Sequence, residues 1–219
     1  MGSQNYGIDP AMLEQYTTDI KATVEAGIQV AIVIGGGNIF RGLSGAAKGM
    51  DRVQGDYMGM LATLINSMAL QAELEKQGLR TELLSGLAIE PICKEMSRRR
   101  AIEAMKEGRV VIIGGGSGNP FFTTDTASAL RAVEIQADAI LKGTRVDGVY
   151  TADPEKDPTA KKFTTLSFQE ALGKKLKIMA LTAFALCEEN NLPIYVFDMN
   201  RQGNLLRVVS GEPIGTEIK

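Results

Sequence analysis

The amino-acid sequence predicts an α/β protein, a three-layer αβα sandwich with a mainly parallel central sheet. Two short apolar runs rich in β-branched residues, 29–34 and 110–113, are typical of strands buried on both faces. Helical patterns lie between such runs, and this alternation favours parallel strands covered by helices. A chain of 219 residues fits one domain, predicted over residues 1–219.

Local signals define the remaining elements. Asp9 followed by Pro10 is a helix start, and Ser167 with Glu170 three residues later forms a capping box. Glycines follow several helical patterns as stop signals. The predicted helices are residues 10–26, 56–77, 97–107, 124–135, the segment opened by Ser167, and residues 179–190. The further predicted strands are residues 80–84, 139–142 and 194–197.

The predicted helix 56–77 has apolar residues three and four positions apart, so we expect it to pack against the sheet. These residues are Met60, Leu61, Leu64, Ile65 and Met68. The methionines in this helix are expected to fill the core. Residues 144–162, rich in Asp, Pro, Thr and Lys, are predicted to form a long functional loop.

The composition excludes several classes of chemistry. The chain has no histidine, so a Ser-His-Asp triad, a Cys-His pair and a zinc site with His ligands are impossible. Cys93 and Cys187 form no CxxC pattern and are expected to be free thiols in a reducing compartment. A net charge of -2 argues against nucleic-acid binding. Neither a membrane span nor a signal peptide is predicted, so the expected location is cytoplasmic.

Two glycine-rich segments, residues 35–42 and 114–125, each follow a predicted buried strand. Glycines let backbone N–H groups approach an anion, and a following helix adds its positive N-terminal end. Neither segment matches the P-loop or the dinucleotide-binding motif. One such segment alone is compatible with a simple tight turn, but two of them favour phosphate binding.

Several charged residues near these segments have both a chemical and a structural interpretation. Arg41 is a cation beside a phosphate-shaped loop or a solvated surface residue. Asp125 either positions a metal-bound nucleotide or a lysine, or stabilises a helix N-terminus. Asp56 opens a predicted helix, so capping is its structural alternative. The run 98–100 is a solvated helix face or an effector-phosphate site, and residues 142–154 are a candidate nucleotide-binding loop.

Four segments together resemble the bacterial uridylate (UMP) kinases of the amino acid kinase superfamily. They are IGGGNIFRG (34–42), GDYMGMLAT (55–63), GSGNPFFTTD (116–125) and LKGTRVDGVYTADPEKDPTA (141–160). The resemblance covers essentially the whole chain. It implies transfer of a phosphoryl group from Mg²⁺-ATP to UMP, with Mg²⁺ held mainly by the nucleotide. It also implies a homohexamer that GTP activates and UTP inhibits.

The resemblance implies a role for each matching residue. The UMP-binding residues would be Gly36, Asp56, Ser117, Gly118, Asn119, Pro120, Phe121, Phe122, Thr123 and Thr124. The ATP-binding residues would be Gly37, Arg41, Thr144, Tyr150 and Asp153. Apart from the resemblance, the residues themselves suggest a catalytic group of Arg41, Asp125 and, as a second candidate cation, Lys142, which is otherwise a surface lysine at a strand end. The GTP-linked segment would be Gly2, Ser3, Gln4, Asn5, Tyr6 and Gly7.

Two departures from the family pattern define an alternative function. The family carries a first strand with a Lys-Leu-Ser-Gly-Glu motif, and Met1 aligns just after it, which indicates a late gene start, a truncation or a lost lysine. Ala180 stands where the family usually has Asp. The alternative is therefore a nucleotide-binding or regulatory module of the same fold without turnover.

Overall fold

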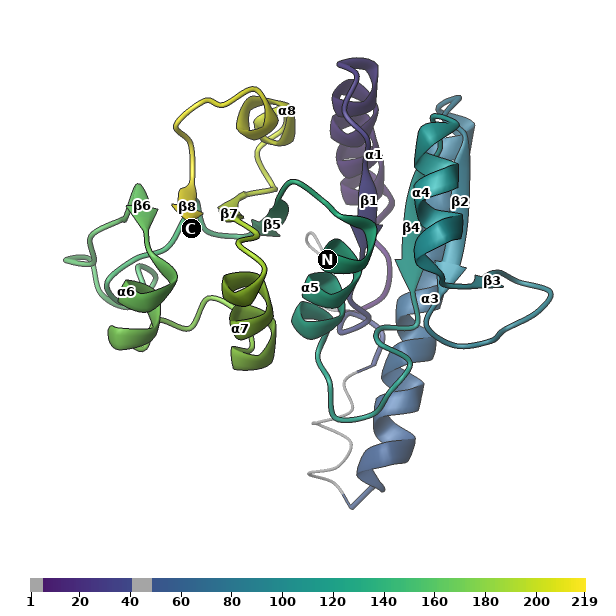
Figure 1. Ribbon diagram of the computed structural model, residues 1–219, viewed down its shortest axis with the longest axis horizontal. Coiled ribbons are helices and arrows are strands. Elements are labelled where there is room, and N and C mark those ends of the chain that lie inside the picture. Colours follow the sequence, from purple (N-terminus) through teal and green to yellow (C-terminus); the bar gives the residue numbers. More distant parts are fainter. Residues whose placement is uncertain (1–5, 41–48) are drawn as a thin grey trace. The chain divides into compact units, whose positions relative to one another are not determined.

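The computed structural model describes residues 6–40 and 49–219, and the chain divides into two compact units. The first unit is Met1–Ser128 and the second is Ala129–Lys219, so the division falls within one helix, α5 (Thr124–Ile135). Figure 1 labels the elements of both units. The expectation of a single domain over residues 1–219 stays a prediction.

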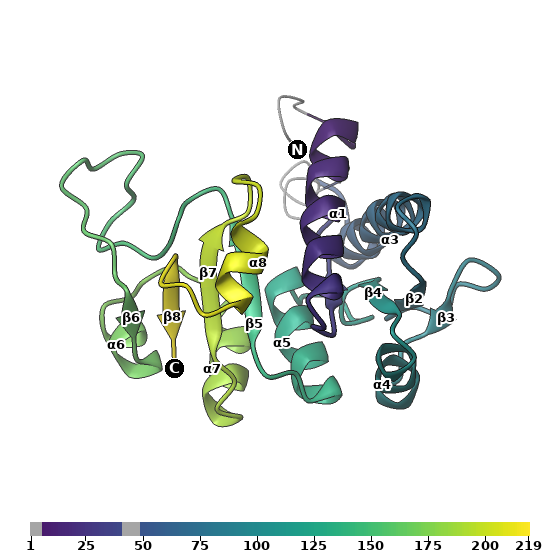
Figure 2. The same cartoon turned by 90° about the horizontal axis from the view of Figure 1, so that it is seen from above.

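The first unit is built on a parallel sheet with the strand order β1-β4-β2-β3. Figure 2 shows α1 and α3 on one side of these strands and α4 on the other. This arrangement confirms the predicted α/β class. The elements before α5 are α1 (Pro10–Glu25), β1 (Ala31–Val33), α3 (Arg52–Lys76), β2 (Thr81–Ser85), β3 (Lys94–Glu95), α4 (Arg98–Lys106) and β4 (Val110–Gly114).

The second unit has a four-stranded sheet of its own, with the order β5-β7-β8-β6. Its strands are parallel except for the antiparallel pair of β7 with β8. Figures 1 and 2 place α8 on one side of this sheet, with α6 and α7 on the other. The elements after α5 are β5 (Ile140–Thr144), β6 (Thr165–Leu166), α6 (Phe168–Gly173), α7 (Leu181–Glu189), β7 (Ile194–Asp198), α8 (Asn204–Val209) and β8 (Thr216–Ile218).

Both local helix-start predictions are confirmed. Asp9 accepts hydrogen bonds from the amides of Ala11 and Met12 at the start of α1, and Pro10 is the first helical residue. Ser167 and Glu170 form a complete capping box at α6, with each side chain accepting from the other residue's amide. These polar side chains satisfy donors that the helix itself leaves unpaired.

The long helix α3 begins one turn earlier than its pattern predicts. Its N-cap is Asp51, whose carboxylate accepts from the Gln54 amide, and the first helical residue is Arg52. Asp56 therefore lies in the second turn and does not cap the helix. The capping interpretation of Asp56 is wrong, because the cap requirement is already met by Asp51.

The apolar residues of α3 cover two faces, and only one of them is core. Met60 and Leu64 are buried, whereas Leu61, Ile65 and Met68 are 45–50% exposed. The prediction that the methionines fill the core is right for Met60 but wrong for Met58 and Met68, which lie exposed on the face turned away from the sheet. Every exposed apolar residue of α3 belongs to what we term the α3 stripe: Val53, Tyr57, Met58, Leu61, Ile65, Met68 and Ala72.

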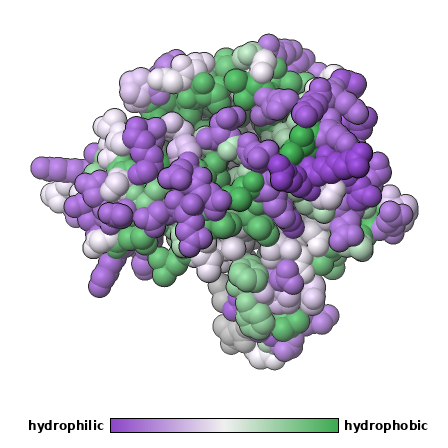
Figure 3. Space-filling view, viewed as in Figure 1, coloured by the Kyte–Doolittle hydropathy of each residue, from purple (hydrophilic) through white to green (hydrophobic). Residues whose placement is uncertain are grey.

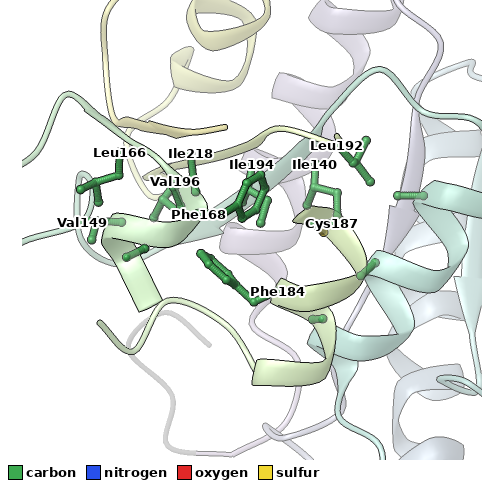
Figure 4. Packing of buried hydrophobic residues seen from close by; sticks show 14 residues of the cluster. Ile140, Val149, Leu166, Phe168, Phe184, Cys187, Leu192, Ile194, Val196 and Ile218 are labelled. Carbon is green, nitrogen blue, oxygen red and sulfur yellow. The ribbon is translucent and has the colours of Figure 1, made fainter. Parts of the chain in front are cut away.

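The two units have separate hydrophobic cores. In the first unit the whole of Val110–Gly114 is buried, as predicted, but Ala31–Val33 is only partly buried. The prediction that this strand is buried on both faces is therefore wrong. Among the described residues β1 pairs only with β4, so it is an edge strand. In the second unit Phe168 and Phe184 make an edge-to-face contact with ring centroids 5.0 Å apart (Figure 4).

Both cysteines are free and buried, as expected from the sequence. Burial raises the pKa of the Cys187 thiol to about 11 and also raises that of Cys93. In the described residues no helix is long and apolar enough to cross a membrane.

Candidate active site

The two glycine-rich loops of the first unit leave neighbouring parallel strands. Val33 of β1 is in register with Ile113 of β4, so the loops that begin at Gly35 and Gly114 emerge at the same edge of the sheet. The carboxyl edge of a parallel sheet is where α/β proteins bind ligands. The sequence prediction that these loops belong together is therefore consistent with their places in the sheet.

Both loops pack against the middle of α3. A Cβ atom on Gly36 would lie 2.7 Å from the Thr63 amide nitrogen and 2.8 Å from the Cβ of Ala62. A Cβ on Gly114 would lie 2.6 Å from a methyl carbon of Leu64. The glycines are therefore needed where the loop backbones approach the helix, because any side chain would push them apart.

Two buried polar side chains of α3 hydrogen-bond to the glycine loops. The Thr63 hydroxyl accepts from the Gly115 amide at 2.8 Å and donates to the carbonyl of Met60 at 2.7 Å. The Asn66 amide donates to the carbonyl of Gly35 at 2.7 Å. Thr63 and Asn66 thereby connect one helix to both loops, although the sequence analysis did not single them out.

Asn66 also pairs with Asn38 of the first loop. Asn66 Nδ2 donates to Asn38 Oδ1 at 2.6 Å, and Asn38 Nδ2 donates back to Asn66 Oδ1 at 3.0 Å. Asn38 Nδ2 also donates to the Gly7 carbonyl at 2.8 Å, and its own carbonyl accepts from the Gly7 amide at 2.9 Å. The described end of the segment Gly2–Gly7 is thus attached to the first glycine loop.

The second loop leads directly into α5. Thr124 is the first helical residue, and a Cβ on Gly35 would lie 3.6 Å from its hydroxyl, so the two loops are close there. Thr123 caps the turn, because its hydroxyl accepts from the Thr126 amide at 3.3 Å. Asp125 lies in the first turn of α5. The positive end of a helix therefore opens onto this loop, an arrangement that favours a bound anion.

The tip of the second loop is exposed. The Asn119 amide donates to the Ser117 hydroxyl at 3.2 Å, while Phe121 and Phe122 are 65% and 51% exposed. Phe121 has a φ of 71°, which is rare for an aromatic residue. Gly118 has a φ of 81°, and a Cβ there would overlap the carbonyl group of Gly86. The loop over Ser117–Thr123 thus leads into Thr124, which lies next to Gly35.

Asp56 connects α3 to this loop tip. Its Oδ2 accepts a hydrogen bond from the Phe121 amide at 2.8 Å. The Arg52 Nε donates to both carboxylate oxygens of Asp56, at 2.9 and 2.8 Å. The Arg52 guanidinium carbon also lies 5.5 Å from the centroid of the Phe121 ring. Asp56 is therefore next to the predicted UMP-binding loop, and Arg52, which the sequence analysis missed, lies against both.

Four of the predicted residues, Lys142, Thr144, Tyr150 and Asp153, belong to the second unit, where Lys142 and Thr144 lie on β5. The Lys142 ammonium donates to the Ile178 carbonyl at 2.7 Å. The Thr144 hydroxyl donates to the carbonyl of Val146 at 2.6 Å. Asp153 accepts from the Glu155 amide at 3.0 Å. β5 and the loop that follows it thus gather this part of the predicted nucleotide site within one unit.

Tyr150 and Asp147 form a hydrogen-bonded pair in the same loop. The Tyr150 hydroxyl donates to Asp147 Oδ1 at 2.5 Å, and the Lys162 ammonium donates to Oδ2 at 2.9 Å. These donors hold the pKa of Asp147 below its ordinary value, and the bond to Asp147 raises the pKa of Tyr150. The Tyr150 ring is thereby fixed at the loop surface.

Some predictions cannot be placed. Arg41 and Gly2–Asn5 lie outside the described residues. Tyr6 is 69% exposed, and Gly37 lies in the first glycine loop. Within residues 6–40 and 49–219 no group of three or more acidic or cysteine side chains is arranged to hold a metal ion.

Three comparisons relate the chain to known proteins. Residues 2–198 match the model of the amino acid kinase family. A uridylate kinase of Parabacteroides distasonis is 59% identical over 99% of this chain and 92% of its own length. The UMP kinase structure from Bacillus anthracis has a TM-score of 0.96 at 36% identity, covering 100% of this chain and 90% of that one. The UMP kinase structure from Ureaplasma parvum has a TM-score of 0.92 at 36% identity, covering 97% and 90%.

Proposed function

The chain belongs to the amino acid kinase family, and we propose that it is the kinase that converts UMP and ATP to UDP and ADP. The observation that carries this proposal is that two glycine loops, from neighbouring parallel strands, rest on one stretch of α3. Such loops offer backbone N–H groups to phosphate oxygens. The full-length likeness to uridylate kinases then names the acceptor.

We propose that UMP binds between the second loop and α3. Ser117–Thr124 would surround its phosphate, and Gly36 and Asp56 would contact the rest of the nucleotide. The support is the proximity of Thr124 to Gly35 and the hydrogen bond between Asp56 and the Phe121 amide. The N-terminus of α5 adds positive potential where the phosphate would lie.

We propose, on the resemblance to uridylate kinases, that five residues bind ATP. Gly37 and Arg41 would contact the ATP phosphates, while Thr144, Tyr150 and Asp153 would hold the nucleoside. The support in the second unit is the ordered hydrogen bonding of all three side chains. The nucleoside-binding surface would thereby be formed before ATP arrives.

The proposed reaction is an in-line transfer that needs no general base. An oxygen of the UMP phosphate forms a new P–O bond to the γ-phosphorus, while the bond from that phosphorus to the β-phosphate oxygen of ATP breaks. The second pKa of a phosphate is about 6, so the attacking oxygen is already ionised at pH 7. A chain without histidine can therefore perform this step.

Charge neutralisation would come from a few groups. Arg41 is the proposed fixed cation, Lys142 a second cation, and Asp125 would position a lysine or the metal-bound nucleotide. Mg²⁺ bound to ATP supplies neutralisation of the phosphate charge, and it needs few protein ligands.

We further propose that the protein is a homohexamer, activated by GTP and inhibited by UTP, in the cytoplasm. The support for self-association is the α3 stripe, an uncharged row of exposed apolar residues about five turns long. Figure 3 shows hydrophobic surface around the part of α3 that lies lowest in the view of Figure 1. Exposed apolar patches on soluble proteins mark interaction sites. The attachment of Gly7 to Asn38 supports a route from the GTP-linked segment to the first loop.

The test is a coupled assay of ADP formation with each nucleoside monophosphate as acceptor. UMP should give turnover, and the variant Asp56→Asn should raise the KM for UMP about tenfold or more with little change in the KM for ATP. Nucleotide binding without any UMP-dependent turnover would replace this proposal with the alternative of a binding module.

A further inference from the structure

Arg52 occupies a position that helix energetics disfavour. It is the first helical residue of α3, where the positive end of the helix dipole repels a cation. Its pair with Asp56 has the basic residue four positions before the acidic one, which is the less favourable order. The stability of α3 therefore does not explain an arginine at this position, and its contacts do.

Arg52 contacts two residues of the site proposed to bind UMP, Asp56 on α3 and Phe121 at the loop tip. Its Nε lies within hydrogen-bond distance of both oxygens of Asp56, and its guanidinium faces the ring of Phe121 within the range of a cation–π contact. The Asp56 side chain is only 12% exposed, so its carboxylate is shielded from competing water. Asp56 in turn accepts from the Phe121 amide. The three residues form one closed set of contacts between α3 and the loop tip.

The set holds Phe121 in a conformation that it would otherwise avoid. A φ of 71° is unfavourable for an aromatic residue, so it persists only where the surroundings fix it. Asp56 fixes the Phe121 backbone through its amide, and Arg52 fixes the ring. Without the guanidinium, the ring contact is lost and the carboxylate can rotate.

The Asp56 carboxylate still has capacity for a ligand. Two carboxylate oxygens offer about four lone-pair sites, and the two contacts to Arg52 with the one to Phe121 occupy three of them. One site remains to accept a hydroxyl of a bound nucleotide. Arg52 thus fixes the direction of this acceptor without competing for it.

We propose that Arg52 is a positioning residue for UMP: it orients Asp56 and the Phe121 loop tip, and it thereby sets the affinity for UMP. This inference rests on the proposed function. The contacts of UMP with Asp56 and the loop are present both in the bound state and in the transition state. Loss of Arg52 should therefore weaken binding of UMP and leave the chemical step nearly unchanged.

The test compares Arg52→Gln with a matched control, Arg207→Gln. Arg207 on α8 also donates through Nε to a carboxylate, that of Glu212 at 2.7 Å, and its side chain is 38% exposed against 35% for Arg52. Arg52→Gln should raise the KM for UMP about tenfold, with kcat within about threefold and the KM for ATP unchanged. Arg207→Gln should change none of the three.

A lysine variant separates charge from geometry. Arg52→Lys keeps the charge but loses the planar guanidinium, so its KM for UMP should fall between those of the wild type and Arg52→Gln. If Arg52→Gln melts well below the control, the lysine variant carries the kinetic test instead. Equal changes in the KM for UMP and for ATP, or an unchanged KM for UMP, would overturn the role of Arg52.

A spectroscopic readout reports the contact directly. The chain contains no tryptophan, so Phe121→Trp introduces a single indole at the loop tip, whose emission can be excited separately from that of the five tyrosines. Adding Arg52→Gln to it should shift the emission and reduce the change seen on adding UMP. Identical spectra with and without Arg52 would show that the ring contact is absent. A wild type that forms no UDP would overturn the proposed function, whereas an active wild type with an unchanged Arg52→Gln would overturn only this inference.

Discussion

The hydroxyl of Thr63 accepts a hydrogen bond from the amide of Gly115, 52 residues further along the chain, at 2.8 Å. Three residues on, Asn66 donates to the carbonyl of Gly35 in the other glycine loop. One turn of α3 therefore fixes the backbones of both loops. Because these loops are the proposed phosphate-binding elements, the helix sets the geometry of the site as much as the loops do.

Thr63→Val should destabilise the protein. Valine has nearly the shape of threonine but no acceptor, so the buried Gly115 amide would lose its partner. We expect the free energy of unfolding to fall by about 1–3 kcal/mol, measured by urea denaturation. Thr18→Val on α1 is the control, because the exposed Thr18 hydroxyl bonds only within its own helix. Equal stabilities for the two variants would refute the importance of the Thr63 contact.

Gly36→Ala should displace the first loop from α3. The new methyl group would overlap the Thr63 amide and Ala62, so we expect a loss of about 1–3 kcal/mol in stability. Turnover of UMP should fall at least tenfold, because the loop amides would move. Steady-state kinetics and thermal denaturation measure both effects.

The matched control is Gly59→Ala on α3, the helix that the first loop contacts. A Cβ on Gly59 meets no atom within 4 Å, so this change should raise stability by about 0.4–1 kcal/mol. Both variants replace a glycine with alanine, but only the methyl group added at Gly36 overlaps other atoms. A Gly36→Ala protein as stable and active as Gly59→Ala would contradict the packing account.

Ala180→Asp should stabilise α7. Ala180 is the N-cap of this helix and has no side chain that can accept from the first-turn amides. An aspartate there should add about 0.5–2 kcal/mol to the free energy of unfolding. Ala180→Asn should give a similar gain by capping alone, so a gain confined to aspartate would indicate a purely electrostatic effect. No gain in melting temperature for either variant would show that the lack of a capping side chain at Ala180 does not limit the stability of α7.

The Asp147–Tyr150 pair should contribute to stability in a pH-dependent way. The folded pKa of Asp147 is lowered, so its contribution is present above the unfolded value of about 3.9 and is lost as the pH falls below it. The folded pKa of Tyr150 is raised, so its contribution is present below about pH 10 and is lost as the pH rises further. The Asp147 side chain is 56% exposed, so both effects should be below about 1 kcal/mol.

Tyr150→Phe tests this pair, because it removes the hydroxyl and keeps the ring. Unfolding at several pH values should show a shallower loss of stability below pH 4 and no loss from this group above pH 10. Lys162 still contacts Asp147 in the variant, so part of the acid dependence should remain. Superimposable pH profiles for the variant and the wild type would contradict the assignment.

The sequence predicted most of what depends on neighbouring residues. Asp9 with Pro10 and Ser167 with Glu170 mark helix starts because the cap bonds form within three residues. The helix α8 was missed, because it is short and its N-cap is Gly203 with no capping side chain. The short strands β3, β6 and β8 were also missed, since two or three residues carry no period.

The rest of the site depends on contacts that no local pattern encodes. Thr63 and Asn66 are polar residues in an apolar helix, and only their distant partners explain their burial. Arg52 lies four residues before Asp56, but its contact with Phe121 joins positions 69 residues apart in the sequence. The one signal available in the sequence was a polar residue at a helix position whose spacing places it among core residues.

The central claim is that this chain transfers a phosphoryl group to UMP, and ³¹P nuclear magnetic resonance tests it most directly. The protein is incubated with Mg²⁺, ATP and UMP, and the phosphorus resonances of all nucleotides are followed with time. The account predicts that UDP and ADP appear in equal amounts, and that neither forms when UMP or the protein is left out. Formation of ADP with inorganic phosphate and no UDP, or no consumption of ATP at all, would contradict it.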